Sequence, residues 1–407
     1  MKVKRILAVA FVLVWTLVMA GVASAADTIK IGILGPISND VGEGEVNAAK
    51  MAVEVINKAG GISGKKVELF IEDDENKPEK AVNGLKKLVM VDQVHAVLGG
   101  HSSGVVLSLM DHIARYRIPF ISTGSSSNRL TETVGENYDK YKYFFRIMVN
   151  ETGQADGMID LVLNYLLPKM NVKKIAVISE DAKWTEFTNS IFLEAVKKAG
   201  ITVTDYIRFP IKETDFAPII SRVKASNVDF LIETSSIADG AVYINQWHDM
   251  QGPPIGGCNT SAGTDEFWDK TNGKCLSEII FMYGAYPIDL TPTTRKFWND
   301  YLKRYNIVAR YSSGFTYDGI MVLAEAIKKG GSTKPDDLVK ALESTSHPGV
   351  SGLIEFDKKT HNVLYGKGRP TLVWLQWQGK GKRVAIHPKE VAEGNFILPT
   401  WWKAKSN

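Results

Sequence analysis

One short segment carries residues whose types and spacing could do chemistry. Residues 99–104 read Gly-Gly-His-Ser-Ser-Gly, and residues 100–104 match the G-x-S-x-G pattern of a hydrolase nucleophile elbow, with Ser102 as the nucleophile. The segment also lies between an expected strand and an expected helix, so its backbone N–H groups could bind a carboxylate at the helix N-terminus. Ser102 and Ser103, taken alone, could be only N-cap residues of that helix.

The hydrolase interpretation needs partners for the serine. An acid and then a histidine should follow it, and His347, His361 and His387 satisfy this order. No HGGG-type oxyanion segment accompanies them, and a single hydrolase domain would leave a second α/β unit unexplained. The histidines show no H-E-x-x-H pattern and the cysteines no C-x-x-C pattern. We therefore expect a binding protein rather than an enzyme, with no metal and no cofactor.

The composition describes an ordinary globular chain. It has 407 residues, of which 44% are hydrophobic and 23% charged, and this length predicts two domains. The net charge is +4, but the first 25 residues contribute three positive charges and no acid, which leaves 4 − 3 = +1 for the rest. A nearly neutral body argues against nucleic acid or an anionic membrane surface as the main partner.

The N-terminus indicates export. Residues 1–25 combine a basic start, a mostly apolar run at 6–20 and the small residues Ala23-Ser24-Ala25, which is typical of a signal peptide cleaved after Ala25. An uncleaved membrane anchor is the alternative, because the run is nearly long enough to span a bilayer. No later apolar run approaches the roughly 18 residues of a membrane span. We expect a soluble periplasmic or extracytoplasmic protein.

Export would permit a disulfide between the two cysteines. Cys258 and Cys275 are the only thiols of the chain. Sequence spacing cannot give the distance between their Cα atoms, so a bridge and two separate thiols both stay open.

Strand-like and helix-like segments alternate along most of the chain. In the first third, strands are expected at 29–34, 67–71, 94–98 and 118–122, and helices at 47–58, 78–91 and 104–116. After Asn150 the alternation restarts, with strands at 174–179, 202–209, 228–233 and 254–257, and helices at 153–167, 186–199, 216–225 and 239–250. This alternation predicts an α/β fold with two doubly wound parallel-sheet lobes.

The last third does not continue the alternation. Helices are expected at 294–305, 315–329 and 334–344, and strands at 353–356 and 372–378. These segments are too few for a third core. We expect them to complete the two lobes, which requires the chain to cross between the lobes more than once.

An ordered set of motifs resembles a known family. The motifs are IKIGILGP at 29–36, INKAGGI at 56–62 with Gly64, EDDEN at 72–76, LGGHSS at 98–103, IPFIS at 118–122 and YDG at 317–319. The chain resembles the periplasmic solute-binding proteins of branched-chain amino acid ABC transporters, of the leucine/isoleucine/valine-binding type. The resemblance implies a type I periplasmic-binding fold with a three-strand hinge near Arg146, Gly284 and Gly349. Lobe one would combine 26–146 with 285–349, and lobe two 147–284 with 350–407.

The resemblance also implies a function and a site. The chain would be a monomeric receptor that captures a small carboxylate-bearing solute, an amino acid above all, by hinge closure and delivers it to an ABC permease. A ligand-presenting sensor would share this fold. By resemblance, Ser103, helped by nearby backbone N–H groups, would bind the carboxylate. A carbonyl of Gly124 or Ser125 and the hydroxyl of Ser126 would receive the amino group, and Trp184 would form a wall that is alternatively core packing. Ser102 is predicted to lie beside Ser103 in the same site. These six residues form the predicted ligand site.

The chain departs from the family pattern at one position. Amino-acid binders usually direct a glutamate of lobe two at the ligand ammonium, but residues 256–260 read Gly-Gly-Cys-Asn-Thr. Either another carboxylate substitutes, or the ligand lacks that charge, because an unpaired buried ammonium is costly. The substitutes would be Glu43, Glu45, Glu233 and Asp239, and each is expected to be a solvated surface acid.

Overall fold

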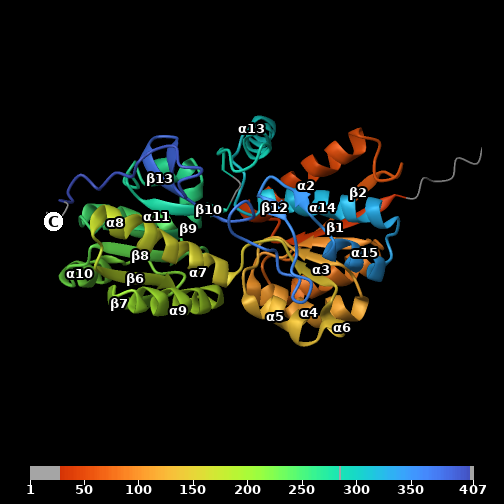
Figure 1. The fold of residues 1–407 in the computed structure, drawn as a ribbon, viewed down its shortest axis with the longest axis horizontal. Helices are drawn as coiled ribbons and strands as arrows, with labels where there is room; N and C mark the ends of the chain where they lie inside the picture. Colours follow the sequence, from red (N-terminus) through yellow and green to blue (C-terminus); the bar gives the residue numbers. More distant parts are fainter. Residues whose placement is uncertain (1–27, 284–285, 404–407) are drawn as a thin grey trace, which may run out of the picture.

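The computed structural model describes residues 28–283 and 286–403, which form two lobes side by side along the long axis (Figure 1). The predicted signal segment 1–25 and the predicted hinge residue Gly284 lie outside the described residues. Within the described part of the chain, no helix is long and apolar enough to cross a membrane.

The first lobe is built on a five-stranded parallel sheet in the order β2-β1-β3-β4-β5. Its strands are β1 (Ile29–Gly35), β2 (Val67–Asp73), β3 (Ala96–Gly99), β4 (Phe120–Ser122) and β5 (Phe144–Arg146). The helices along this stretch are α2 (Asp40–Lys58), α3 (Pro78–Met90), α4 (Ser103–Tyr116), α5 (Asn128–Glu136) and α6 (Tyr138–Tyr141). Because β1, β3, β4 and β5 are covered on both faces, almost all of their residues are buried.

The second lobe is built on a seven-stranded sheet in the order β14-β13-β10-β9-β8-β6-β7. Its strands are β6 (Lys174–Glu180), β7 (Thr202–Phe209), β8 (Phe230–Ser235), β9 (Ile255–Asn259), β10 (Ile279–Tyr283), β13 (Leu372–Gly379) and β14 (Lys382–His387). The strands from β10 to β7 are parallel, whereas β13 and β14 pair antiparallel. The predicted parallel sheet is thus extended by an antiparallel hairpin at one edge.

Helices cover the second sheet as well. They are α7 (Glu151–Asp160), which continues through a π-helical turn at Leu161–Leu166 into α8 (Leu167–Met170), then α9 (Lys183–Lys198), α10 (Ala217–Ala225), α11 (Gly240–Asp249), a 3₁₀ turn at Thr260–Gly263 and α12 (Glu266–Lys270). Helix α9 packs closely against α7.

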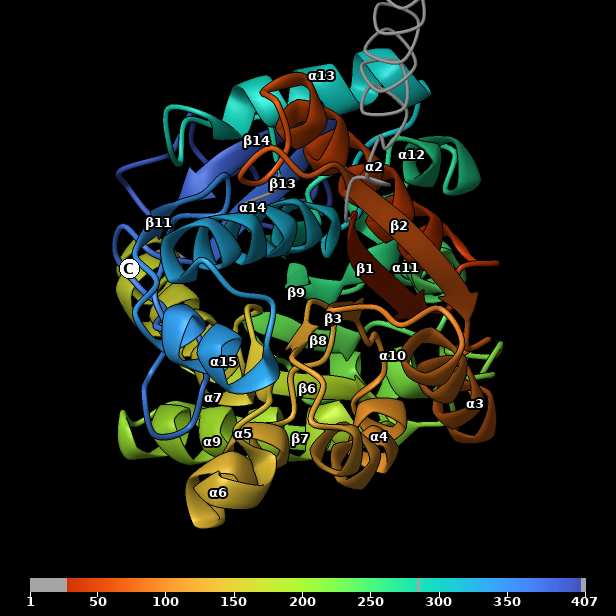
Figure 2. The ribbon, with the colours of Figure 1, turned by 90° about the vertical axis from the view of Figure 1, so that its right-hand side faces the viewer.

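The last third of the chain contributes elements to both lobes. Helices α13 (Thr294–Tyr305), α14 (Ser313–Gly330) and α15 (Pro335–Glu343) return to the first lobe, where α14 packs along α2 (Figure 2). Gly319 of α14 lies against Leu98 of β3, where a Cβ atom would be 2.8 Å from the leucine side chain. The short strands β11 (His347–Pro348) and β12 (Leu353–Ile354) follow, and β13 and β14 then join the second sheet.

The final return to the second lobe occurs later than the predicted crossing near Gly349. Asn362 forms a parallel bridge with Arg146, and the Arg146 N–H donates to the His361 carbonyl at 3.0 Å. The buried guanidinium of Arg146 also donates to Asn362 Oδ1 at 2.8 Å. Residues 361–363 therefore lie beside the edge of the first sheet, and the chain reaches the second sheet only at Leu372.

Helix α2 begins seven residues before the start predicted for it. Asn39 is the N-cap, and its side-chain oxygen accepts hydrogen bonds from the N–H groups of Val41 and Gly42. Gly42 and Gly44 weaken the helical pattern in the sequence, but there is no room for side chains at either position. A Cβ at Gly42 would be 2.3 Å from the Pro36 carbonyl oxygen.

The two cysteines do not form a disulfide. Cys258 at the end of β9 and Cys275 before β10 are both free thiols and both buried. Burial raises the pKa of Cys275 to about 12, so this thiol stays protonated at neutral pH.

Candidate functional site

The candidate site is a cleft between the lobes with about 620 Å³ of space that no atom fills, part of which is open to solvent. Loops at the carboxyl ends of the strands in both sheets line it, as expected for ligand sites in open α/β sheets. The first lobe contributes Asn76, 101–104, Gly124, Ser126, Met148 and Tyr311. The second lobe contributes Gln154, 182–184, Ser236, Ile237, Cys258, Thr260 and Tyr283.

The predicted anion-binding segment lies at the first-lobe wall. Gly99 and Gly100 have φ values of +125° and +77°, and a Cβ at Gly99 would be 2.1 Å from the Leu34 carbonyl oxygen, so this turn requires glycine. Helix α4 begins at Ser103, and the N-cap residue Ser102 makes no side-chain capping bond. The N–H groups of the first turn have no acceptor within the helix and face the cleft with the positive end of its dipole.

Ser103 is oriented by the neighbouring loop. Its Oγ accepts the N–H of Ser127 at 3.1 Å, and its side chain is buried at the cleft wall. Because the oxygen is the acceptor in this bond, the hydroxyl proton of Ser103 remains to be donated to a ligand. This geometry suits a carboxylate acceptor.

The second serine-rich loop reaches the cleft only in part. Gly124 and Ser126 line it, whereas Ser125 does not, and the Ser125 hydroxyl lies 2.5 Å from Ser122 Oγ inside the first lobe. The Ser126 carbonyl accepts the Glu151 N–H at 3.0 Å. This loop is therefore bonded to the protein more completely than a flexible polar turn would be.

Three rings that the sequence analysis did not single out also line the cleft. His101 Nδ1 lies 2.7 Å from the Tyr311 hydroxyl, which donates to the Gly124 carbonyl at 3.3 Å. The ring centroids of Tyr311 and Tyr283 are 5.8 Å apart, so this contact joins the two lobes. Burial lowers the pKa of His101 to about 4, which keeps the imidazole neutral at physiological pH.

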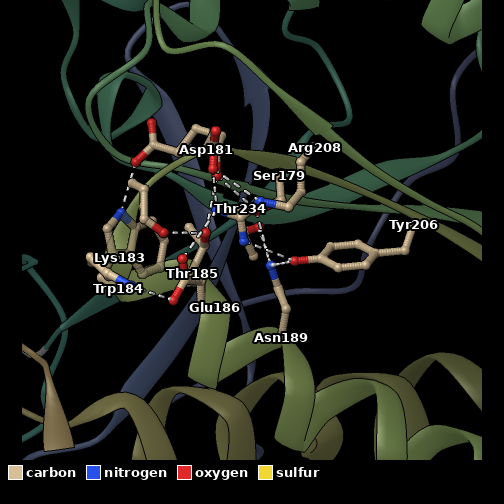
Figure 3. A network of polar contacts seen from close by, with 12 residues as sticks. Ser179, Asp181, Lys183, Trp184, Thr185, Glu186, Asn189, Tyr206, Arg208 and Thr234 are labelled. Atoms are coloured by element: carbon tan, nitrogen blue, oxygen red, sulfur yellow. Dashed lines mark hydrogen bonds and ion pairs between the residues drawn. The ribbon is translucent and has the colours of Figure 1, made fainter. Parts of the chain in front are cut away.

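Trp184 forms part of the second-lobe wall, at the start of α9 (Figure 3). Its indole Nε1 donates to Glu180 Oε1 at 2.7 Å. The other oxygen of the same carboxylate accepts the N–H groups of Ile237 and Ala238 at 2.8 and 2.9 Å. Glu180 thus holds both the tryptophan and the loop after β8 in place. No motif in the sequence indicates this role.

Two of the four candidate acids are not surface residues, contrary to the prediction. Glu45 lies on the buried face of α2 beneath the Gly124 loop, where it accepts from Thr123 Oγ1 at 3.2 Å. Glu233 lies inside the second lobe on β8. Burial raises the pKa of each to about 7. Glu43 and Asp239 are exposed, and Asp239 caps α11.

The arrangement does not support a hydrolase. Of the three histidines that could follow Ser102 in a triad, His347 contacts Glu325, His361 contacts Glu343, and His387 contacts Asp160, and none of them lines the cleft. Among the described residues, no group of three histidine, cysteine or acidic side chains could hold a metal ion.

The profile of the periplasmic binding protein family matches residues 28–367. The chain belongs to this family, whose members bind solutes and are not enzymes. The predicted family and fold class are therefore confirmed: the two doubly wound lobes form the type I periplasmic-binding fold.

Individual relatives agree with the family. The Leu/Ile/Val-binding protein homolog 3 of Brucella melitensis biotype 1 is 29% identical over 372 residues, which cover 90% of this chain and 96% of the relative. The isoleucine complex of LivJ from Streptococcus pneumoniae superposes with a TM-score of 0.76 at 22% identity, covering 92% of this chain and all of the neighbour. A solute-binding protein from Rhodopseudomonas palustris, in complex with 3,4-dihydroxybenzoic acid, superposes with a TM-score of 0.72 at 20% identity. The match covers 86% of this chain and 93% of the neighbour.

Proposed function

We propose that the chain is the extracytoplasmic substrate-binding subunit of an ABC importer and captures a small carboxylate-bearing solute, an amino acid or a related acid. The observation that carries the proposal is the N-terminus of α4, which directs unbonded N–H groups and the Ser103 hydroxyl into a cleft walled by the other lobe. The ligands printed for the two structural neighbours, isoleucine and 3,4-dihydroxybenzoic acid, both carry a carboxyl group.

Capture requires the lobes to move. The segments 146–151, 286–294 and 363–372 lie between elements of different lobes, and we assign the hinge to them. A ligand that touches both walls binds the closed form better than the open form and so shifts the population toward closure.

Location and partners follow from the same proposal. Residues 1–25 would direct export and be removed, and the mature chain would work as a monomer that delivers its ligand to a membrane permease. Deletion of the protein should then abolish uptake of its ligand. Uptake that continues after deletion would instead favour a sensor that presents the ligand to a receptor.

The experiment that tests binding combines a thermal-shift panel with solution scattering. Amino acids, hydroxy acids and simple carboxylates are added to the mature chain, and a ligand of the folded form raises the melting temperature by mass action. The same compound should lower the radius of gyration as the lobes close. If no carboxylate raises the melting temperature or changes the scattering, the proposed function is wrong.

A further inference from the structure

The cleft wall contains no negatively charged side chain among the described residues. The described residues of this wall include one cation, Lys183, and no aspartate or glutamate. Two exposed acids beside the second-lobe wall, Asp181 and Glu186, pair with Arg208 and Lys183 (Figure 3). Because Lys183 is paired with Glu186, the positive charge that the wall offers a ligand comes from the N-terminus of α4, and the wall carries no formal negative charge.

Three buried acids lie behind the cleft wall, and of these only Glu180 has hydrogen-bond partners for both carboxylate oxygens. Glu45 lies behind the loop of Thr123 and Gly124, and its Oε1 would be 3.3 Å from a Cβ atom at Gly124. Glu180 is bonded to Trp184 and to two backbone N–H groups. Glu233 lies within β8 near Glu278, inside the second lobe. None of the three belongs to the cleft wall.

The neutral acceptors that could receive an ammonium are partly occupied. The Gly124 carbonyl accepts from Tyr311, and the Ser126 carbonyl accepts from Glu151. An ammonium group transferred into this cleft would lose its hydration shell and meet no counter-ion, which is unfavourable even with hydrogen bonds. A carboxylate, by contrast, meets the positive end of α4.

Two side-chain oxygens at the wall do lack partners. Asn76 Oδ1 and Gln154 Oε1 are both buried without a hydrogen bond, and Gln154 is 1% exposed. A neutral amide oxygen accepts a hydroxyl proton well but compensates no charge. These two groups suit a ligand hydroxyl better than an ammonium.

We infer that the cleft selects a carboxylic acid with an apolar body and without an ammonium group, and that a hydroxyl group is accepted in its place. The inference rests on the proposed function, because it narrows the class of solute that the same cleft takes. The rings of Trp184, Tyr283 and Tyr311 supply the wall for the apolar body.

Matched ligands test the inference. Calorimetry at pH 7 compares L-leucine with 2-hydroxy-4-methylpentanoate and 4-methylpentanoate, and L-phenylalanine with 3-phenyllactate and 3-phenylpropanoate. Within at least one series, the hydroxy acid or the plain acid should bind at least tenfold more tightly than the amino acid. An amino acid that binds more tightly than both of its analogues would overturn the inference and leave the proposed function intact. If none of the six binds, the inference fails, and the broader panel of carboxylates described above decides whether the proposed function stands.

A variant pair tests the electrostatic basis. Thr260 lines the cleft, and its hydroxyl donates to the Ser236 carbonyl at 2.8 Å. Thr260→Glu adds a carboxylate there and should raise the affinity for the amino acid relative to its plain analogue at least tenfold, whereas the neutral Thr260→Gln should not. An unchanged ratio in Thr260→Glu would contradict the inference. A wild-type preference for the amino acid that disappears in Glu45→Gln would overturn it and identify Glu45 as the ammonium partner.

Discussion

At the residue scale, Ser103 has the clearest assignment to a ligand group. Its Oγ is held by the Ser127 N–H at 3.1 Å, which fixes the direction in which its proton can be donated. Ser102 is the N-cap by position but makes no capping bond, so a hydroxyl at 102 contributes nothing measurable to the end of the helix.

Ser103→Ala should weaken binding of the carboxylate ligand by about 1 to 3 kcal/mol, because a hydrogen bond to a charged acceptor is lost. Titration calorimetry measures the change. Ser108→Ala is the matched control: this serine is on the same helix, donates to the Val105 carbonyl and does not line the cleft. Equal affinities for the Ser103→Ala variant and wild type would remove Ser103 from the site.

The structure brings five of the six predicted site residues to the cleft wall, because the ends of neighbouring parallel strands share one edge. Their roles toward a ligand stay predictions. Ser125 does not line the cleft, since only the fold decides which residues of a loop face inward. His101, Tyr283 and Tyr311 were missed for a different reason. Tyr311 comes close to His101 only through the return of the chain to the first lobe, which no local pattern signals.

At the scale of elements, the second-lobe wall depends on one carboxylate. Glu180 ends β6, bonds the indole at the start of α9 and bonds the two N–H groups before α11. Asn189 also links the neighbouring strands β6 and β8, because its side-chain amide donates to Ser179 and Thr234, both at 3.0 Å (Figure 3). The wall is thus prearranged before any ligand enters.

Glu180→Ala should lower ligand affinity roughly tenfold or more, because it leaves three donors without their acceptor and frees the tryptophan to change rotamer. Glu180→Gln keeps one oxygen as an acceptor and should have a smaller effect. Calorimetry measures affinity, and thermal unfolding of the ligand-free chain monitors stability. An affinity that is the same in both variants and in wild type would show that Glu180 does not position the wall.

Most elements were predictable and a few were not. Strand β7 and helix α13 have the predicted bounds, since a short run rich in β-branched and aromatic residues and a helix with clear flanks are distinct patterns. Strand β10 was missed because a continuous apolar run such as Ile279–Tyr283 does not distinguish a buried strand from a buried helix. Strand β14 had a signal that was not used: Gly379 and Gly381 flank a turn between two apolar runs.

At the scale of the whole molecule, each lobe contains carboxyl groups whose pKa values are raised by burial. Those of Glu45 and Glu233 rise to about 7. The folded state then holds protons that the unfolded chain releases above about pH 4.5, so these groups lower the free energy of unfolding as the pH rises toward 7. The lowered pKa of His101 has the opposite effect: it raises the free energy of unfolding as the pH rises from about 4 to 6.5.

A comparison of variants separates these opposing contributions. Glu45→Gln removes one titrating group without changing its size, so it should stabilise the fold at pH 8 by about 2 to 3 kcal/mol and change it little at pH 5. Urea unfolding at the two pH values measures the difference. A stability difference from wild type that is the same at pH 5 and pH 8 would show that Glu45 does not titrate as its burial implies.

The late return of the chain to the first lobe determines the order in which the molecule can be completed during synthesis. The face of α2 that α14 covers stays bare until residue 330 has been made, and β10 gains its neighbour β13 only after residue 372. The first lobe cannot close its interior before α14 has been made, and the second cannot before β13 has been made. A ribosome-bound fragment ending at Tyr283 is therefore a chain with two unfinished cores, and both are complete only after β13 has been added.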